Sequence, residues 1–227
     1  MRVMKTIIAG LLLLCFAGSA LALDKAELDN RIRKLSLKFD ALQAKPDKRV
    51  PAEILSKAQG IIFLDRTKAG FLFAFQGGSG VAMVKEPKTD QWSPSAFLNA
   101  SEASLGFQIG GQQSFIVILL MSTNATRMLT DSKFDFGGEA RGTAGDSSAG
   151  AEGNFSSTEQ PVLIYSDHQG LYGGAAIKGG AISFDLNANL AYYNQAVSME
   201  DILFDKRVKP TQAATDLAAK IVEHAKK

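Results

Sequence analysis

Basic side chains in one segment near the start of the chain have types and spacing suited to binding anionic groups. They surround an apolar stripe with alternating spacings of four and three residues: Leu28, Ile32, Leu35, Phe39 and Leu42. This spacing predicts an amphipathic helix over Lys25–Gln43. The candidate ligand-binding cations on this helix are Arg31, Arg33, Lys34 and Lys38. Cations beside an apolar face can meet anionic headgroups at a bilayer surface.

Two interpretations of this helix stay open from the sequence. Its apolar stripe can enter a membrane interface, or it can pack on a sheet and leave the charges in water. A second set of candidate cations is expected around a hairpin: Arg66, Lys68 and Lys85. We expect the strands to carry these three side chains along one edge.

Residue types that support catalysis or metal binding are sparse. His168 and His224 are the only histidines, and the spacing of Gly77-Gly78-Ser79-Gly80 fits neither a nucleophile elbow nor a phosphate loop. We therefore expect no enzymatic activity, no cofactor and no zinc site. Calcium binding by acidic residues between Asp131 and Glu152 is an alternative, but their spacing favours a solvated loop.

The first 22 residues have the pattern of an export signal. Arg2 and Lys5 precede an apolar run, and Ala20-Leu21-Ala22 fits a cleavage site. A membrane anchor is the alternative, although the apolar run is shorter than the ~20 residues that a span needs. Leu14 stands where a lipoprotein signal has a small residue, which argues against lipidation of Cys15. The mature protein is therefore predicted to be periplasmic or secreted and to lack cysteine.

Removal of residues 1–22 leaves as many basic as acidic side chains, because Arg2 and Lys5 are lost. A nucleic-acid-binding protein usually carries a basic excess, so this class of partner is not expected. Attraction to anionic lipid must come from local patches.

The rest of the chain predicts an α+β protein, with a glycine-rich antiparallel sheet or partly closed barrel between N- and C-terminal helices. Residues 23–50 are assigned to the amphipathic helix and residues 51–227 to the domain. Further helices are expected after Pro51, Ser198 and Pro210. The expected strands are Ile61–Leu64, Gly70–Phe75, Gly80–Val84, Ala103–Gly110, Ser114–Met121, Val162–Ser166, Leu171–Lys178 and Ala181–Leu186.

Glycines punctuate the middle of the chain: most of the 21 lie between Gly70 and Gly180. Gly77-Gly78 is interpreted as a hairpin turn between two strands. Phe134–Phe155, rich in glycine, alanine and serine, is interpreted as two thin strands joined near Asp146 or as a disordered loop.

The order of the motifs resembles the SYLF domain family, also known as DUF500. The resemblance covers about Pro51 to Leu217 and rests on Ala58-x-Gly60-Ile61-Ile62-Phe63, Lys68-Ala69-Gly70-Phe71, Gly77-Gly78-Ser79-Gly80-Val81, Trp92-Ser93-Pro94-Ser95, Gly106-Phe107-Gln108-Ile109-Gly110-Gly111-Gln112, Tyr165-Ser166, Gly170-Leu171-Tyr172-Gly173-Gly174 and Ile202-Leu203.

The resemblance implies a compact α+β domain that binds phospholipid, with actin binding in some eukaryotic members. An exported chain would not meet actin in its own cell, so that partner is not expected. Lys85 stands where family members often have arginine, and lysine lacks the planar fork that holds phosphate bidentately. The leading hypothesis is non-enzymatic binding of anionic phospholipid at a bacterial envelope membrane. The alternatives are an envelope scaffold that binds protein partners, and a hydrolase whose catalytic residues the sequence does not reveal, for which His168→Ala is the simplest test.

Overall fold

The computed structural model describes residues 23–69, 73–105, 112–130, 133–134, 162–167, 170–172 and 181–226. Its centre is an eight-stranded sheet in the order β5-β8-β3-β2-β1-β4-β6-β7, and every neighbouring pair is antiparallel. Within the described chain the sheet is open, with β5 and β7 as its edges. The strands are β1 (Gly60–Ala69), β2 (Phe73–Val84), β3 (Ala96–Leu105), β4 (Gln112–Leu120), β5 (Lys133–Phe134), β6 (Val162–Ser166), β7 (Gly170–Tyr172) and β8 (Ala181–Phe184).

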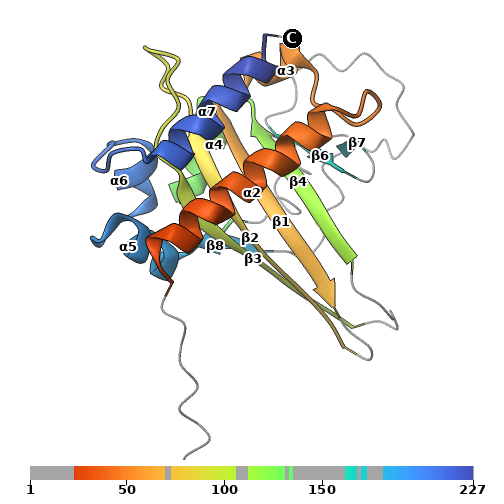
Figure 1. Cartoon of the computed structure of the whole chain (residues 1–227), viewed down its shortest axis with the longest axis horizontal. Coiled ribbons are helices and arrows are strands. Elements are labelled where there is room, and N and C mark those ends of the chain that lie inside the picture. Colours follow the sequence, from red (N-terminus) through yellow and green to blue (C-terminus); the bar gives the residue numbers. More distant parts are fainter. Residues whose placement is uncertain are drawn as a thin grey trace, which may run out of the picture.

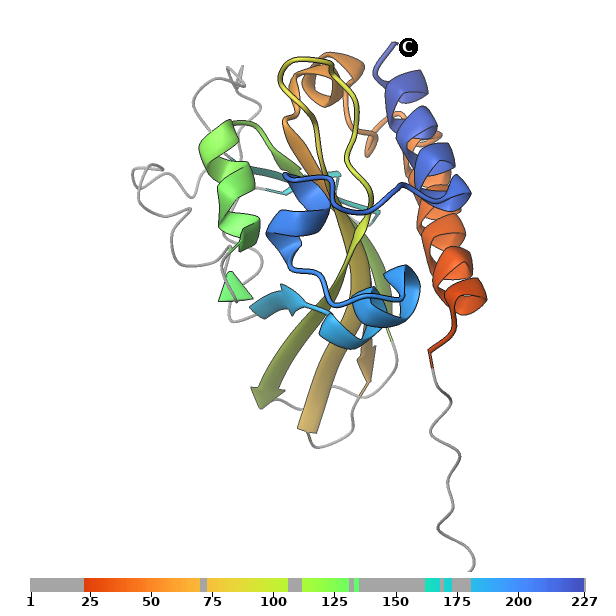
Figure 2. The same cartoon turned by 90° about the vertical axis from the view of Figure 1, so that its left-hand side faces the viewer.

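Helices cover both faces of this sheet (Figure 2). They are α2 (Lys25–Gln43), α3 (Ala52–Lys57), α4 (Thr123–Arg127), a 3-10 turn η1 (Met128–Thr130), α5 (Leu186–Tyr193), α6 (Met199–Leu203) and α7 (Gln212–His224). The predicted α+β class with terminal helices and an antiparallel sheet is therefore confirmed.

The two faces of the sheet form two hydrophobic cores, because successive side chains of a strand point to opposite sides. In β1, Ile61 and Phe63 belong to the core under α2 and α7, whereas Ile62 and Leu64 belong to the core under α4 and α6. A strand buried on both faces reads as a continuous apolar run rather than an alternating one. This explains the unbroken apolar sequence at the start of β1.

Helices α2 and α7 run parallel across one face of the sheet (Figure 1). Near their first turns the Tyr192 hydroxyl donates to Asp29 Oδ1 at 2.5 Å and contacts the Thr211 hydroxyl. Near their last turns His224 Nε2 lies 2.8 Å from Asp40 Oδ1. Polar contacts at both ends thus fix α7 alongside α2.

The predicted hairpin turn at Gly77-Gly78 is wrong. Both glycines lie inside the continuous strand β2, opposite Thr67 and Arg66 of β1. A Cβ on Gly78 would lie 2.8 Å from the carbonyl oxygen of Asp65, and a Cβ on Gly80 would overlap the Phe63 carbonyl. These glycines allow a neighbouring backbone to approach closely, a role that the sequence does not distinguish from a turn.

Helix α5 is absent from the sequence prediction, which assigned Leu186 to a strand. Asp185 caps this helix by accepting from the Ala188 amide at 3.0 Å. Asn189, which is fully buried, accepts from the Phe97 amide and donates to the Phe97 carbonyl, both at 2.9 Å. These bonds attach α5 to β3.

Strand β3 begins at Ala96, seven residues before its predicted start. Helix α6 begins at the predicted capping box, in which Ser198 and Asp201 bond each other's backbone amides. The assignment of Phe134–Phe155 falls outside the described residues beyond Phe134, as do His168 and the acidic residues considered for calcium.

Candidate lipid-binding surfaces

The apolar stripe of α2 packs on the sheet. Leu28, Ile32 and Phe39 are completely buried, and Leu35 and Leu42 nearly so. The sequence left open whether this stripe enters a membrane or packs on a sheet, and in the structure it packs on the sheet. The side of the docked helix that stays accessible is therefore the opposite one.

Lys34 and Lys38 hold α2 against β1 through one carboxylate. Their ammonium nitrogens lie 2.8 Å and 2.6 Å from the two oxygens of Asp65. Burial raises the pKa of Asp65, but hydrogen bonds and charge from the two lysines outweigh it and leave that pKa below its ordinary value. We call this cluster the Asp65 clamp.

Replacing Asp65 by asparagine should lower the free energy of unfolding by about 1–2 kcal/mol at pH 7, because two lysines lose their carboxylate. The folded-state pKa is depressed, so the stabilisation exists above the ordinary aspartate pKa of about 3.9 and is lost as pH falls through the folded value. Urea unfolding of both proteins should therefore show a difference at pH 7 that shrinks below about pH 4.

Glu53→Gln is the matched control for this substitution, since Glu53 pairs with Lys57 at 2.7 Å on an exposed helix surface. It should leave stability unchanged at both pH values. A difference between wild type and Asp65→Asn that is independent of pH would contradict the clamp.

The outward side of α2 presents a second, different surface. Leu37 is 69% exposed, the most exposed large apolar side chain of the described residues. Arg33, one helical turn earlier, donates to Asn30 Oδ1 at 3.1 Å, and the Lys34 side chain is 61% exposed. We call Arg33, Lys34 and Leu37 the outer strip. Figure 2 shows α2 and α7 as the outermost layer on that side of the sheet.

Leu37 was not among the predicted residues, because it lies off the apolar stripe. A leucine outside the 3-4 pattern is the sequence signal that would have indicated it. Arg31, a predicted residue, forms an ion pair with Glu27 at 2.7 Å. Its charge is thus compensated locally. Arg33 donates to the neutral amide of Asn30 and interacts with the Asp29 carboxylate through charge alone.

The expectation that Arg66, Lys68 and Lys85 share one edge is wrong. Val84, the residue before Lys85, pairs with Gly60 at the start of β1, whereas Arg66 and Lys68 lie towards its end. Because β2 is continuous, Lys85 follows its last residue, whereas Arg66 and Lys68 lie opposite Gly78 and Gln76 further back along the strand. Arg66 is half-buried and has an interaction partner; the Lys68 side chain lies outside the described part. Their lipid-binding role stays a prediction.

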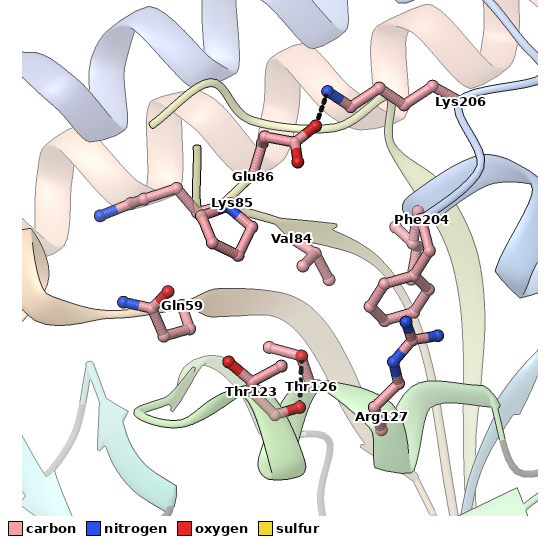
Figure 3. A pocket seen from close by; sticks show the side chains of 11 residues that line it. Gln59, Val84, Lys85, Glu86, Thr123, Thr126, Arg127, Phe204 and Lys206 are labelled. Carbon is pink, nitrogen blue, oxygen red and sulfur yellow. Dashed lines mark hydrogen bonds and ion pairs between the residues drawn. The ribbon is translucent and has the colours of Figure 1, made fainter. Parts of the chain in front are cut away.

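Lys85 lines a pocket on the opposite face of the sheet from α2, beside α4 and the end of α6 (Figure 3). The pocket has a volume of about 160 Å³. It is lined by Gln59, Val84, Lys85, Glu86, Pro87, Thr123, Thr126, Arg127, Leu203, Phe204 and Lys206. Sequence reasoning missed Arg127 and Lys206, which are distant from Lys85 in the chain.

The Lys85 ammonium donates to the Ser56 carbonyl oxygen at 2.7 Å and lies 5.4 Å from the centre of the Trp92 ring. Burial lowers the pKa of Lys85, and the carboxylate of Asp90 opposes this shift. The Lys85 ammonium is therefore directed at Ser56 and Trp92, away from Arg127 and Lys206 (Figure 3).

The described residues contain no group of three or more His, Cys, Asp or Glu side chains placed to hold a metal ion. His224 lies at the end of α7 beside Asp40. None of the described helices combines the length and apolar character needed to cross a bilayer.

Residues 101–224 match the family model Ysc84, described as "Las17-binding protein actin regulator". The chain is 31% identical over 170 residues to SH3 domain-containing YSC84-like protein 1 of Bos taurus and of Homo sapiens, covering 74% of this chain and 50% and 49% of those proteins. It is also 31% identical over 175 residues to Protein YSC84 of Saccharomyces cerevisiae, covering 75% of this chain and 37% of the yeast protein.

No solved structure matches the chain. The chain spans about half the length of the animal relatives and less of the yeast protein. The family model covers more than half of the chain, and its match includes strands of the sheet and the last helix. The chain therefore belongs to the Ysc84 family, the SYLF domain family that its motifs resemble.

Proposed function

We propose that this chain binds anionic phospholipid at a bacterial envelope membrane surface and catalyses no reaction. The family description names binding and regulation, which supports a binding role. The observation that carries the lipid part is the outer strip, where Arg33 and Lys34 lie one helical turn before the exposed Leu37. Cations near an anionic surface contribute about 1 kcal/mol each, and an inserted leucine adds apolar burial.

The location is part of the same proposal. Residues 1–22 direct the chain out of the cytoplasm, and cleavage after Ala22 leaves the domain in the periplasm or outside the cell. In either place the domain meets a membrane surface as a peripheral protein. Actin, named in the family description, is not a partner of an exported bacterial chain in its own cell.

A second candidate function is protein binding. The family description includes Las17 binding, and α5 exposes Leu186 and Leu190 at 59% and 46%, one helical turn apart. In this candidate an envelope protein contacts α5, and lipid adds no affinity.

Co-sedimentation of residues 23–227 with vesicles tests the lipid proposal. We expect binding to phosphatidylglycerol-containing vesicles at low salt, weaker binding at high salt, and little binding to phosphatidylcholine alone. Equal, salt-insensitive binding to both vesicle types would contradict an electrostatic contact. Binding to neither would favour the protein partner.

A further inference from the structure

We propose that the pocket beside α4 and α6 binds a phosphate group, and that Glu86 occupies part of the anion's place when the pocket is empty. This site lies on the other face of the sheet from the outer strip and does not depend on it. It goes beyond membrane binding, because it is sized for a headgroup or a small phosphate compound.

The pocket's charge is the first argument. Its lining brings together two cations, Arg127 and Lys206, with a single carboxylate, Glu86, whereas the Lys85 ammonium is directed out of the pocket to Ser56. The two cations come from the end of α4 and the segment after α6. Cations in a partly desolvated cleft raise the local concentration of anions. The lining thus favours an anionic ligand.

Arg127 has the geometry of a positioned phosphate ligand. Its guanidinium carbon lies 4.1 Å from the centre of the Phe204 ring, and its Nη1 lies 3.0 Å from Glu200 Oε1. Stacking and this ion pair hold the planar group at the pocket wall, where its other donors can meet phosphate oxygens. Figure 3 shows Arg127 below Phe204, on the same side as Lys206.

The ion pair between Glu86 and Lys206 places a competing carboxylate in the pocket. Both residues line the pocket, and Figure 3 shows the Glu86 carboxylate directed at the Lys206 ammonium. A carboxylate that neutralises a pocket cation competes with any anion that needs the same cation. A phosphate dianion carries more charge than the carboxylate and presents three acceptor oxygens. It can therefore take Lys206 from Glu86 while also accepting from Arg127.

The size of the pocket limits the ligand. A volume of about 160 Å³ is below the range of about 300–1,000 Å³ found for drug-sized ligands. It suits a phosphate group with a small substituent, and acyl chains would remain outside. A phosphate monoester headgroup and a soluble phosphate share this chemistry.

The test measures the affinity of residues 23–227 for inorganic phosphate by titration calorimetry. Glu86→Gln removes the competing carboxylate and should raise the affinity about tenfold, whereas Arg127→Gln should lower it about tenfold. The matched controls are Glu53→Gln and Arg207→Gln, which make the same charge changes outside the pocket lining. A gain of affinity cannot result from misfolding, so Glu86→Gln keeps the test decisive if Arg127→Gln is unstable.

Equal phosphate affinities for Glu86→Gln and Glu53→Gln would overturn the inference. Vesicles of phosphatidic acid in phosphatidylcholine then distinguish the two sources of the ligand. Displacement of the protein from these vesicles by inorganic phosphate would assign the pocket to a lipid headgroup. If the variants differ in affinity for free phosphate as expected but do not differ on vesicles, the pocket is assigned to a soluble phosphate compound. Either result supports the pocket, and neither depends on the outer strip.

Discussion

The double variant Arg33→Glu/Leu37→Ser should lose more than about a hundredfold of its affinity for phosphatidylglycerol vesicles. Reversing one charge near an anionic surface removes about 2 kcal/mol, and losing an inserted leucine removes about 1–2 kcal/mol more. Both side chains point away from the core, so the fold should persist. Vesicle co-sedimentation at low salt measures the loss.

The matched control for this variant is Arg207→Glu/Leu186→Ser. Arg207 is 68% exposed and Leu186 is 59% exposed, and neither belongs to α2. The control makes the same chemical changes and should reduce vesicle binding only by the general effect of net charge. Equal losses in the two double variants would mean that the outer strip has no special role.

Gly80→Ala should lower the free energy of unfolding by about 3 kcal/mol. A Cβ at this position would overlap the Phe63 carbonyl oxygen and lie 2.6 Å from a Leu64 methyl carbon. The backbone of β1 cannot move away without disturbing its pairing with β4 on the other side. The central strands would therefore have to separate locally, which weakens packing in both cores.

Urea denaturation of Gly80→Ala beside Ser79→Ala checks this expectation. Ser79 is the neighbouring residue of the same strand and is only half-buried, so its truncation should cost little. Wild-type stability for Gly80→Ala would show that β1 and β2 tolerate a wider approach than the structure has.

Local patterns in the sequence were enough to predict the elements that have strong periodicity or caps. The alternating spacing of Leu28, Ile32 and Leu35 gives the bounds of α2, and the pairing of Ser198 with Asp201 gives the start of α6. These signals depend on residues within one or two turns of each other, so no tertiary information is needed.

The parts that could not be predicted depend on contacts between distant segments. The pair Gly77-Gly78 reads as a turn, yet in β2 Gly78 and Gly80 are required by the close approach of β1, which the sequence does not place. The pocket joins Lys85, Arg127 and Lys206 only through the sheet and α6. The Asp65 clamp similarly joins residues 27 or more positions apart.

The predicted cations of α2 divide into two groups in the structure. Arg31 and Lys38 are partly covered and form ion pairs with Glu27 and Asp65, whereas Lys34 also contacts Asp65 but keeps a side chain that is 61% exposed. Arg33 is exposed and donates to Asn30, so Arg33 and Lys34 are the cations of the outer strip. The account therefore assigns membrane contact to fewer residues than the sequence proposed, and it adds Leu37.

The central claim is that α2 meets the membrane with its outer strip while its apolar stripe stays on the sheet. The only cysteine of the chain is Cys15, within residues 1–22, so a cysteine introduced into residues 23–227 can be labelled uniquely. The deciding measurement is the fluorescence of an environment-sensitive dye on Leu37→Cys, with Asn187→Cys on α5 as the control, in phosphatidylglycerol vesicles.

The account predicts a blue shift at position 37 on adding vesicles and none at position 187. It also predicts that Ile32→Cys, on the buried side of α2, reacts with a water-soluble thiol reagent equally slowly with and without vesicles. No shift at position 37 despite vesicle binding would contradict membrane contact by the outer strip. Rapid reaction at position 32 on vesicles would show instead that α2 leaves the sheet.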